Sequence, residues 1–423
     1  MSTAGAFLGG ASGRLLPASL PLRFFGAAVA YHLLAWLVLA VSSRDALPLD
    51  GGLGPPLAAL HLLTLGVFGM TALGAAAQLL PVATRQAPVG EHALRAVWWL
   101  YTPGVAVLAW GMHSARPPWI ALGAAAVMLP LAAWTVLVAR HLVGARGMPG
   151  VLAHAWSALA CLVLVLVTAL LLVAGWLGWP APGRQSLLPL HLLVGPFGFM
   201  GLLALGLSYI LVPMFALAVP PPERTQLASC VLVVAGLLLA AASVLAPGVP
   251  LLQPLAWSAG STGVLLHLYL MRQALATGMR QDLGRSFVLV KSAWAALLLA
   301  LVLAGVLWSG LPLPHARGWL ALALVAWLLG MVLGFLQRIL PFLAALHAAA
   351  GRRRGPTASS LTHERALRLH IACHFAALAL LALAVGLGSA TFAQLGAFTG
   401  LAGACAFAVF YLHVLRRLRA ARP

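Results

Sequence analysis

The chain has 423 residues, of which 63% are hydrophobic and only 7% are charged, and its mean hydropathy is +1.02. Soluble domains carry roughly 25% charged residues, so this composition excludes a water-soluble globular surface. The net charge of +19 could suggest a nucleic-acid ligand. Basic residues of membrane proteins gather in cytoplasmic loops, and because the arginines here gather in loops we expect no nucleic-acid role.

Apolar segments follow one another along the whole chain, each reaching the length of about 20 residues that a membrane-spanning helix needs. We predict an all-α polytopic membrane protein, a single transmembrane domain over 1–423, with twelve spanning helices: 23–43, 55–82, 93–113, 117–142, 150–178, 186–217, 226–247, 251–275, 287–311, 317–346, 365–388 and 391–415.

The charges of the connecting segments predict the orientation. Arginines gather in alternate loops, including the basic cytoplasmic loop 347–364, and the opposite side has only Arg44, Arg116, Arg184 and Arg317. The positive-inside rule then places both termini in the cytoplasm of a multi-pass protein of the inner (cytoplasmic) membrane. The short N-terminal segment 1–22 lacks an apolar core followed by a cleavage site, so we expect no cleaved signal.

One pattern recurs in three of the predicted helices. The second reads HLLTLGVFGMTALGAAAQLLPV from His61, and the sixth reads HLLVGPFGFMGLLALGLSYILVPMF from His191. The tenth shares the closing half, in which a glycine lies seven residues before a proline: Gly74 and Pro81, Gly206 and Pro213, Gly334 and Pro341.

The period of this pattern predicts the architecture. The prolines are 132 and 128 residues apart, enough for four helices in each interval. We therefore predict three pseudo-symmetric four-helix arcs, at about 23–142, 150–275 and 287–415. The alternative is a chance likeness among glycine-rich apolar helices.

Histidine is the polar residue that enters the predicted spans, since no Asp or Glu lies well inside one. Ionisable side chains within a membrane are functional candidates by default. His61 and His191 begin their spans and His315 just precedes 317–346, so we expect all three near the outer face. Neutral imidazole binds haem iron and copper, which makes His61, His191 and His315 candidate cofactor ligands and the first two candidate metal ligands.

His370 and His374 are four residues apart on one predicted helix, so both project from one face and could ligate a metal together. The alternative for any single histidine is a hydrogen bond to a neighbouring carbonyl or across helices, and we favour it for His32, His267 and His413. Arg338 is expected to extend toward the cytoplasmic interface. Its alternative role is to pair with a haem propionate, which makes it a candidate cofactor-binding residue.

These residues resemble a known family. The span 55–82, with His61 at its outer end and GAAAQLLP at its inner end, resembles the second helix of subunit I of haem-copper oxidases, especially the nitric oxide reductase branch. HLLTLG followed by FGM is also similar to a segment of NnrS-like membrane proteins, described as haem- and copper-containing and linked to nitric oxide metabolism. The resemblance implies twelve helices in three arcs, His61 as an axial haem ligand and His191 as a copper-side histidine.

The chain also departs from the oxidase pattern. The seventh span has no adjacent histidine pair and the tenth has no His-x-His. The full oxidase set of two haems and copper cannot be assembled at the usual positions unless His315, His370 and His374 replace the missing ligands. We therefore expect a divergent member that binds one haem, or haem plus copper.

The leading hypothesis is a membrane haem or copper protein of nitric oxide or respiratory redox metabolism, with a small respiratory subunit or an electron donor as partner. Whether it is an oxidoreductase-like enzyme is left open. One alternative is a transporter or assembly factor that handles copper or haem. The other is a structural membrane subunit whose histidines serve only helix packing.

Overall fold

The computed structural model describes residues 14–42, 52–88, 90–349 and 355–421, and the regular structure in these ranges is entirely helical. The helices match the predicted segments to within a few residues at each end: α2 (Ser19–Ser42), α3 (Pro55–His61) continuing through η1 (Leu62–Gly69) into α4 (Met70–Ala83), α5 (Glu91–His113), α6 (Pro117–Val143), α7 (Pro149–Trp176), α8 (Arg184–Leu193) continuing through η2 (Val194–Gly201) into α9 (Leu202–Ala216), α10 (Glu223–Leu245), α11 (Leu252–Thr277), α12 (Gly284–Ser309), α13 (Ala316–Ala349), the single turn η3 (Ser359–Leu361), α14 (Glu364–Leu387) and α15 (Ala390–Ala420).

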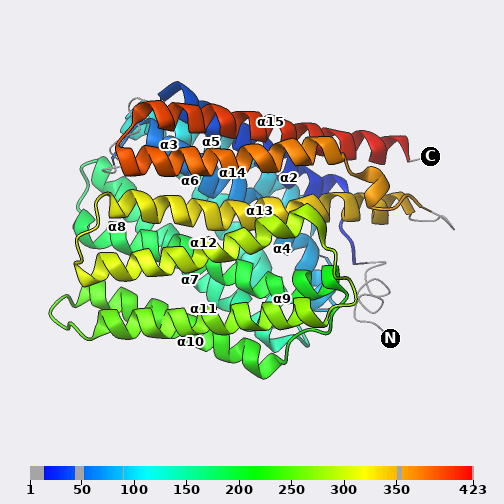
Figure 1. Cartoon of the computed structure of the whole chain (residues 1–423). Coiled ribbons are helices and arrows are strands. Elements are labelled where there is room, and N and C mark those ends of the chain that lie inside the picture. The colour runs from blue at the N-terminus through cyan, green and yellow to red at the C-terminus, as the bar shows by residue number, and fades with distance from the viewer. Residues whose placement is uncertain (1–13, 43–51, 89, 350–354, 422–423) are drawn as a thin grey trace.

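The long helices lie roughly parallel in one bundle, and the described chain begins and ends at the same side of it (Figure 1). Residues 1–13 of the predicted N-terminal segment and the arginines at 352–354 of the predicted basic loop lie outside the described residues.

Ten of the described helices are long and apolar enough to cross a membrane, which confirms the prediction of a multi-pass helical membrane protein. The two other long helices, α5 and α11, are less apolar. The first turns of α5 contain Glu91 and Arg95, and α11 contains a run of small and polar residues over 258–262. Each packs along a more apolar neighbour in a hairpin, α5 on α6 and α11 on α10.

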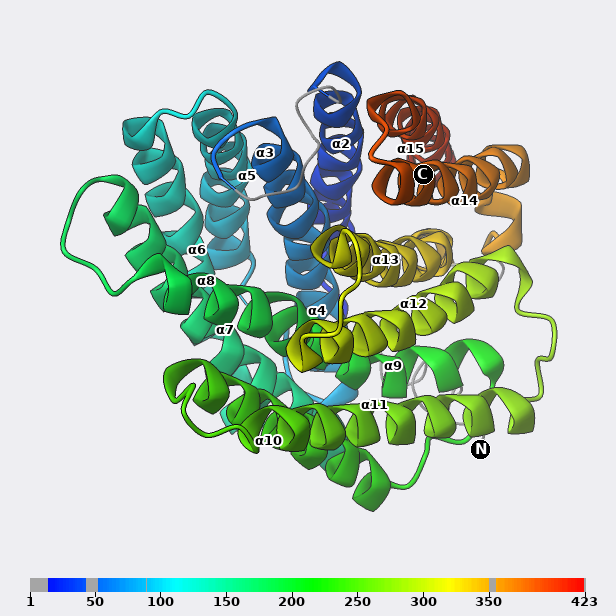
Figure 2. The same ribbon diagram turned by 60° about the vertical axis from the view of Figure 1, so that its left-hand side comes forward.

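Two of the three helices that contain the repeated pattern are the most deeply placed. In the most apolar stretches of α3–α4 and α8–α9, 72% and 83% of the residues are buried, the highest shares among the ten. Helix α13 contacts both η1 and η2, and Figure 2 shows it near the middle of the bundle with α12 and α14 beside it.

The repeated glycines make equivalent contacts. A Cβ added to any of them would lie 2.7–2.8 Å from a side chain of the preceding long helix, closer than real Cβ atoms approach: Gly74 against Phe24 of α2, Gly206 against His154 of α7, and Gly334 against Val290 of α12. Small residues allow helices to approach closely in lipid. Each glycine therefore fixes the packing of one repeat helix on its neighbour.

The π-helical segments η1 and η2 interrupt two of the repeat helices at equivalent places, 132 residues apart, which is also the spacing of Pro81 and Pro213. In η2, Pro196 has no N–H to continue an α-helical hydrogen-bond ladder. In η1, the Thr64 hydroxyl donates to the Leu60 carbonyl at 3.0 Å and so competes with a backbone N–H for that acceptor. π-Helical segments within α-helices are rare and occur frequently at functional sites.

Candidate functional site: buried histidine centres

His61 and His191 each lie just before a π-helical segment, and both imidazoles have the same hydrogen-bonding pattern. His61 Nδ1 lies 2.9 Å from the Leu57 carbonyl, which can only accept, so Nδ1 donates. His191 Nδ1 lies 3.0 Å from Thr168 Oγ1, whose own proton is directed at the Leu164 carbonyl 2.8 Å away, so this Nδ1 donates as well. A neutral imidazole has one N–H, and Nε2 of each ring therefore keeps its lone pair.

His61 and His191 are close enough for their charges to influence each other. Both side chains are half-buried. We call His61 and His191 the outer pair. His315 is not part of it in the described structure: it is exposed in the connection before α13, with a positive φ of 57°. Its role as a cofactor ligand stays a prediction.

A second group, here called the inner cluster, consists of His32, His370 and His374, which are all buried where α2, α14 and α15 meet. The ring centroids of His32 and His370 are 6.2 Å apart, and those of His370 and His374 are 6.0 Å apart. The predicted pair on α14 therefore gains a third imidazole from α2.

Two rings of the inner cluster differ in their protonation pattern. His370 Nδ1 donates to the Gly403 carbonyl at 3.0 Å, which leaves Nε2 as a buried acceptor without a partner among the described residues. His32 Nε2 accepts from Trp36 Nε1 at 2.9 Å, so the proton lies on Nδ1, a buried donor to which no described residue offers an acceptor. His370 can therefore bind a metal ion through the lone pair of Nε2, whereas His32 can donate a hydrogen bond from Nδ1–H.

A third group, here called the lateral cluster, joins His154 of α7, Tyr209 of α9 and His267 of α11, all fully buried. The Tyr209 ring lies 5.4 Å from that of His154 and 4.9 Å from that of His267, between centroids. His154 Nδ1 donates to the Gly150 carbonyl at 2.8 Å. Within the described part of the chain, no hydrogen-bond partner is present for His154 Nε2, the Tyr209 hydroxyl or either ring nitrogen of His267.

These unpartnered atoms define what the clusters can bind. A buried polar atom left unsatisfied costs about 1–3 kcal/mol, so a metal ion, a proton or water would stabilise each cluster. Imidazole nitrogens bind copper or zinc at about 2.0–2.1 Å, which places rings that share an ion about 5–6 Å apart between centroids. The His370–His374 separation of 6.0 Å lies at the upper end of this range, and the His32–His370 separation of 6.2 Å lies just beyond it. Within the described ranges, no three His, Cys, Asp or Glu residues are already arranged to hold a metal ion.

The space between the three repeat helices is too small for a porphyrin. It is a cavity of about 80 Å³ with an almost wholly apolar lining, to which Phe68, Met200 and Phe335 contribute from η1, η2 and α13. Small-molecule pockets usually measure about 300–1,000 Å³. This central cavity therefore fits a few atoms at most, and a haem does not fit there as the helices stand.

Arg338 is engaged by the protein itself. Its Nε donates to Ser286 Oγ at 2.8 Å and a terminal nitrogen donates to the Leu283 carbonyl, so the guanidinium joins α13 to the start of α12. A haem propionate would have to compete with these acceptors. The assignment of Arg338 to a cofactor stays a prediction.

The sequence identified His370 and His374 as a pair but did not identify their partner His32, or the grouping of His154 and His267 with Tyr209. The partners come from helices far apart in the chain, and no spacing rule relates them. The only signal was that each histidine lies inside a span, where an unpaired polar side chain is costly.

A comparison of the chain with protein-family models found no match, and neither did a comparison with curated proteins. The arrangement of the histidines is therefore the basis on which a function can be proposed.

Proposed function

We propose that this protein is a membrane metalloprotein that holds copper, haem iron or both through buried histidines, and that it works in nitric oxide or respiratory redox metabolism. One observation carries the proposal: His61, His154, His191 and His370 each bond Nδ1–H to an oxygen. Metal-binding histidines almost always hold their non-ligating N–H in this way, which fixes the tautomer and aims the other nitrogen at the metal.

For the architecture we propose twelve membrane crossings in three four-helix arcs, including the less apolar α5 and α11. The equivalent glycine contacts of Gly74, Gly206 and Gly334 support the arcs. The matching positions of η1 and η2 support them too. The arginine distribution supports an inner-membrane orientation with both termini in the cytoplasm.

We propose different ligands for the different sites. We propose a single copper ion between His370 and His374 of the inner cluster, because their ring centroids are 6.0 Å apart and a small inward movement would let both rings share it. The outer pair, at the half-buried end of the repeat helices, is where we propose haem iron or copper to bind through Nε2.

The test is metal analysis and visible spectroscopy of the full-length protein, purified from cells supplied with copper and a haem precursor. We expect copper or iron near one per chain. His61→Ala should shift a Soret band, if haem is bound, or lower the copper content by at least half. The matched control is His92→Ala, an exposed histidine at the start of α5 that should leave metal and spectrum unchanged. Folded protein that retains neither metal would overturn the proposal.

A second candidate function is transfer of copper or haem across the membrane. It is favoured by the placement of histidines at different depths: the outer pair lies toward one end of the bundle, His32 lies in the middle of α2, and His154, His267 and His370 lie toward the other end. Substoichiometric metal that exchanges rapidly with added copper would favour transfer over a resident cofactor. If instead the double variant of His61 and His191 changes only thermal stability, the histidines serve packing.

A further inference from the structure

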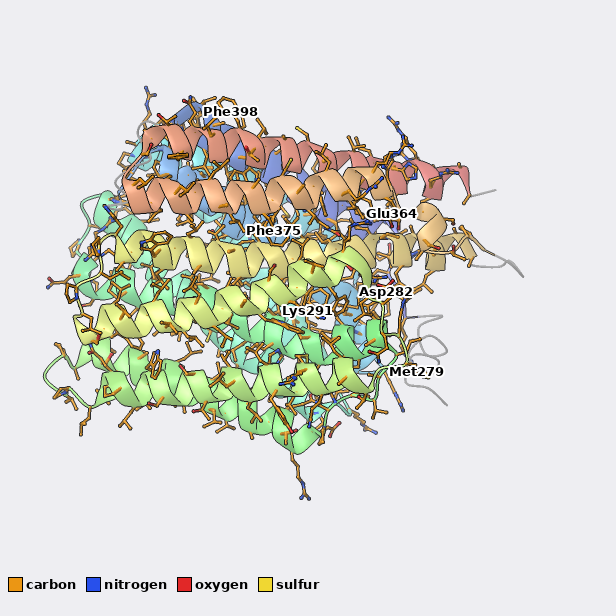
Figure 3. The ribbon with its side chains drawn as sticks, in the orientation of Figure 1. Met279, Asp282, Lys291, Glu364, Phe375 and Phe398 are labelled. Atoms are coloured by element: carbon orange, nitrogen blue, oxygen red, sulfur yellow. The ribbon has the colours of Figure 1, made fainter. Side chains whose placement is uncertain are left out.

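A groove of about 410 Å³ on the surface between α11 and α12 combines an apolar wall with two cations. Leu268, Leu275 and Trp294 line it together with Arg272 and Lys291. Neither cation has an ion pair or a side-chain hydrogen bond within the part of the chain that the structure describes. Figure 3 labels Lys291 on α12.

The depth of the two cations suits the interface of a membrane. Arg272 lies five residues before the end of α11 and Lys291 seven residues after the start of α12. At about 1.5 Å per residue, both lie about 8–10 Å in from the ends of α11 and α12 that the loop 278–283 connects. Nearby Leu265 and Val288 are 54% and 52% exposed, so this face of the hairpin is turned toward lipid.

We propose that this groove binds one anionic phospholipid. Its phosphate would lie between the Arg272 guanidinium and the Lys291 ammonium, and an acyl chain would lie along Leu268 and Trp294. Charge complementarity carries the choice of occupant: two unpaired cations beside an apolar groove require a ligand with an anionic head and an apolar body. Basic pockets between membrane helices on the cytoplasmic side bind such headgroups.

The indole of Trp294 adds a second interaction. Trp294 lies one turn deeper than Lys291, and its Nε1 is buried with no hydrogen-bond acceptor in the ranges that the structure describes. An ester carbonyl of the glycerol backbone, which lies just below the phosphate in a bilayer, would provide an acceptor after a small rotation of the ring. Tryptophan is enriched at this level of membranes because it has an apolar ring and one polar atom.

The experiment titrates palmitoyl-oleoyl phosphatidylglycerol into the full-length protein in mild detergent and counts bound lipid by native mass spectrometry. Phosphatidylcholine and inorganic phosphate are titrated in parallel. We expect one tight phosphatidylglycerol site, weakened about tenfold or more in the double variant Lys291→Gln/Arg272→Gln, because each cation near an anionic lipid contributes to binding. The matched control, Arg416→Gln/Arg417→Gln, removes two exposed cations of α15 and should bind normally.

A second variant separates loss of binding from loss of fold. Ala276 also lines the groove. Ala276→Trp fills the groove while keeping both cations, and it should weaken phosphatidylglycerol binding without changing the elution volume or helical circular dichroism. Equal binding by both double variants would overturn the proposal. So would equal affinity for phosphatidylcholine, or saturable binding of inorganic phosphate that competes with the lipid, which would identify a free-anion site. These outcomes do not depend on bound copper or haem.

Discussion

At the residue scale, a helix can satisfy only one nitrogen of an imidazole. His61 and His154 each reach the carbonyl four residues earlier through Nδ1, at 2.9 and 2.8 Å. The other nitrogen then points away from its own backbone, and its hydrogen-bond partner or metal ion must come from elsewhere. Water rarely supplies that partner in a bilayer, and we therefore propose that the free Nε2 atoms bind metal.

The protonation pattern gives the first prediction. In protein with ring-labelled ¹⁵N histidine, His61, His154 and His370 should all show the neutral tautomer protonated on Nδ1, because a carbonyl accepts from that atom in each case. Solid-state NMR in bilayers measures it through the imidazole ¹⁵N shifts. Addition of copper should move the Nε2 signals and leave the Nδ1–H protons in place. Protonation on Nε2 in the metal-free protein would contradict the assignment.

Arg338 gives a second prediction at this scale. Arg338→Gln should lose the bond to Ser286 and the one to the Leu283 carbonyl, and should lower the free energy of unfolding by about 1–3 kcal/mol. Metal and haem content should stay the same, because the guanidinium stabilises the contact between α13 and α12. Thermal unfolding and metal analysis of the same preparations measure both effects. Loss of haem with unchanged stability would instead support a propionate contact.

At the element scale, the repeat explains why certain glycines cannot be replaced. Gly74 and Gly206 occupy equivalent positions in helices interrupted by η1 and η2, and each lies against the preceding long helix. Any side chain at these positions would push two helices apart. Because Gly206 rests on the Cβ of His154, the packing of α9 on α7 also positions a histidine of the lateral cluster.

The third prediction compares two glycines. Gly206→Ala should lower the free energy of unfolding by about 1–3 kcal/mol, because the new methyl group overpacks a contact that cannot open locally. Gly175→Ala on α7 meets no atom within 4 Å and should be neutral or stabilising by up to about 1 kcal/mol, since alanine is the better helix former. Thermal unfolding in one detergent measures both. Equal effects would show that the close contact has no energetic role.

At the scale of the whole molecule, the topology depends on α5 and α11. Both are long enough to cross a bilayer: 23 and 26 residues extend about 35 and 39 Å. Both pack along an apolar neighbour, so their polar residues can face protein. If both cross, the two ends of the chain lie on one side, as the alternate arginine-rich loops require.

The fourth prediction tests this topology. Single cysteines at Ala87, Arg116, Val249 and Gln281, in a cysteine-free background, flank α5 and α11. We expect a membrane-impermeant maleimide to label Arg116→Cys and Val249→Cys in intact spheroplasts. Ala87→Cys and Gln281→Cys should react only after permeabilisation. Labelling of Ala87→Cys and Arg116→Cys from the same side would show that α5 does not cross.

Local sequence was enough to define the helices and their approximate bounds. Apolar segments of sufficient length must form helices in a bilayer, because every backbone group has to be hydrogen-bonded within the segment. The repeat could also be recognised in the sequence, because glycine and proline affect the helix at the position where they occur. The spacing of His370 and His374 likewise placed both on one helix face, because residues four apart follow one another along the helix surface.

Which histidines meet depends on tertiary packing. His32 joins His370 through the packing of α2 beside α14 and α15, and His267 joins His154 through Tyr209. These contacts link helices hundreds of residues apart or across an arc, and no local rule relates them. The sequence likewise did not predict the π-helical turns or the hydrogen bonds from Arg338 to the start of α12. Both depend on which hydrogen-bond acceptors the neighbouring helices leave free.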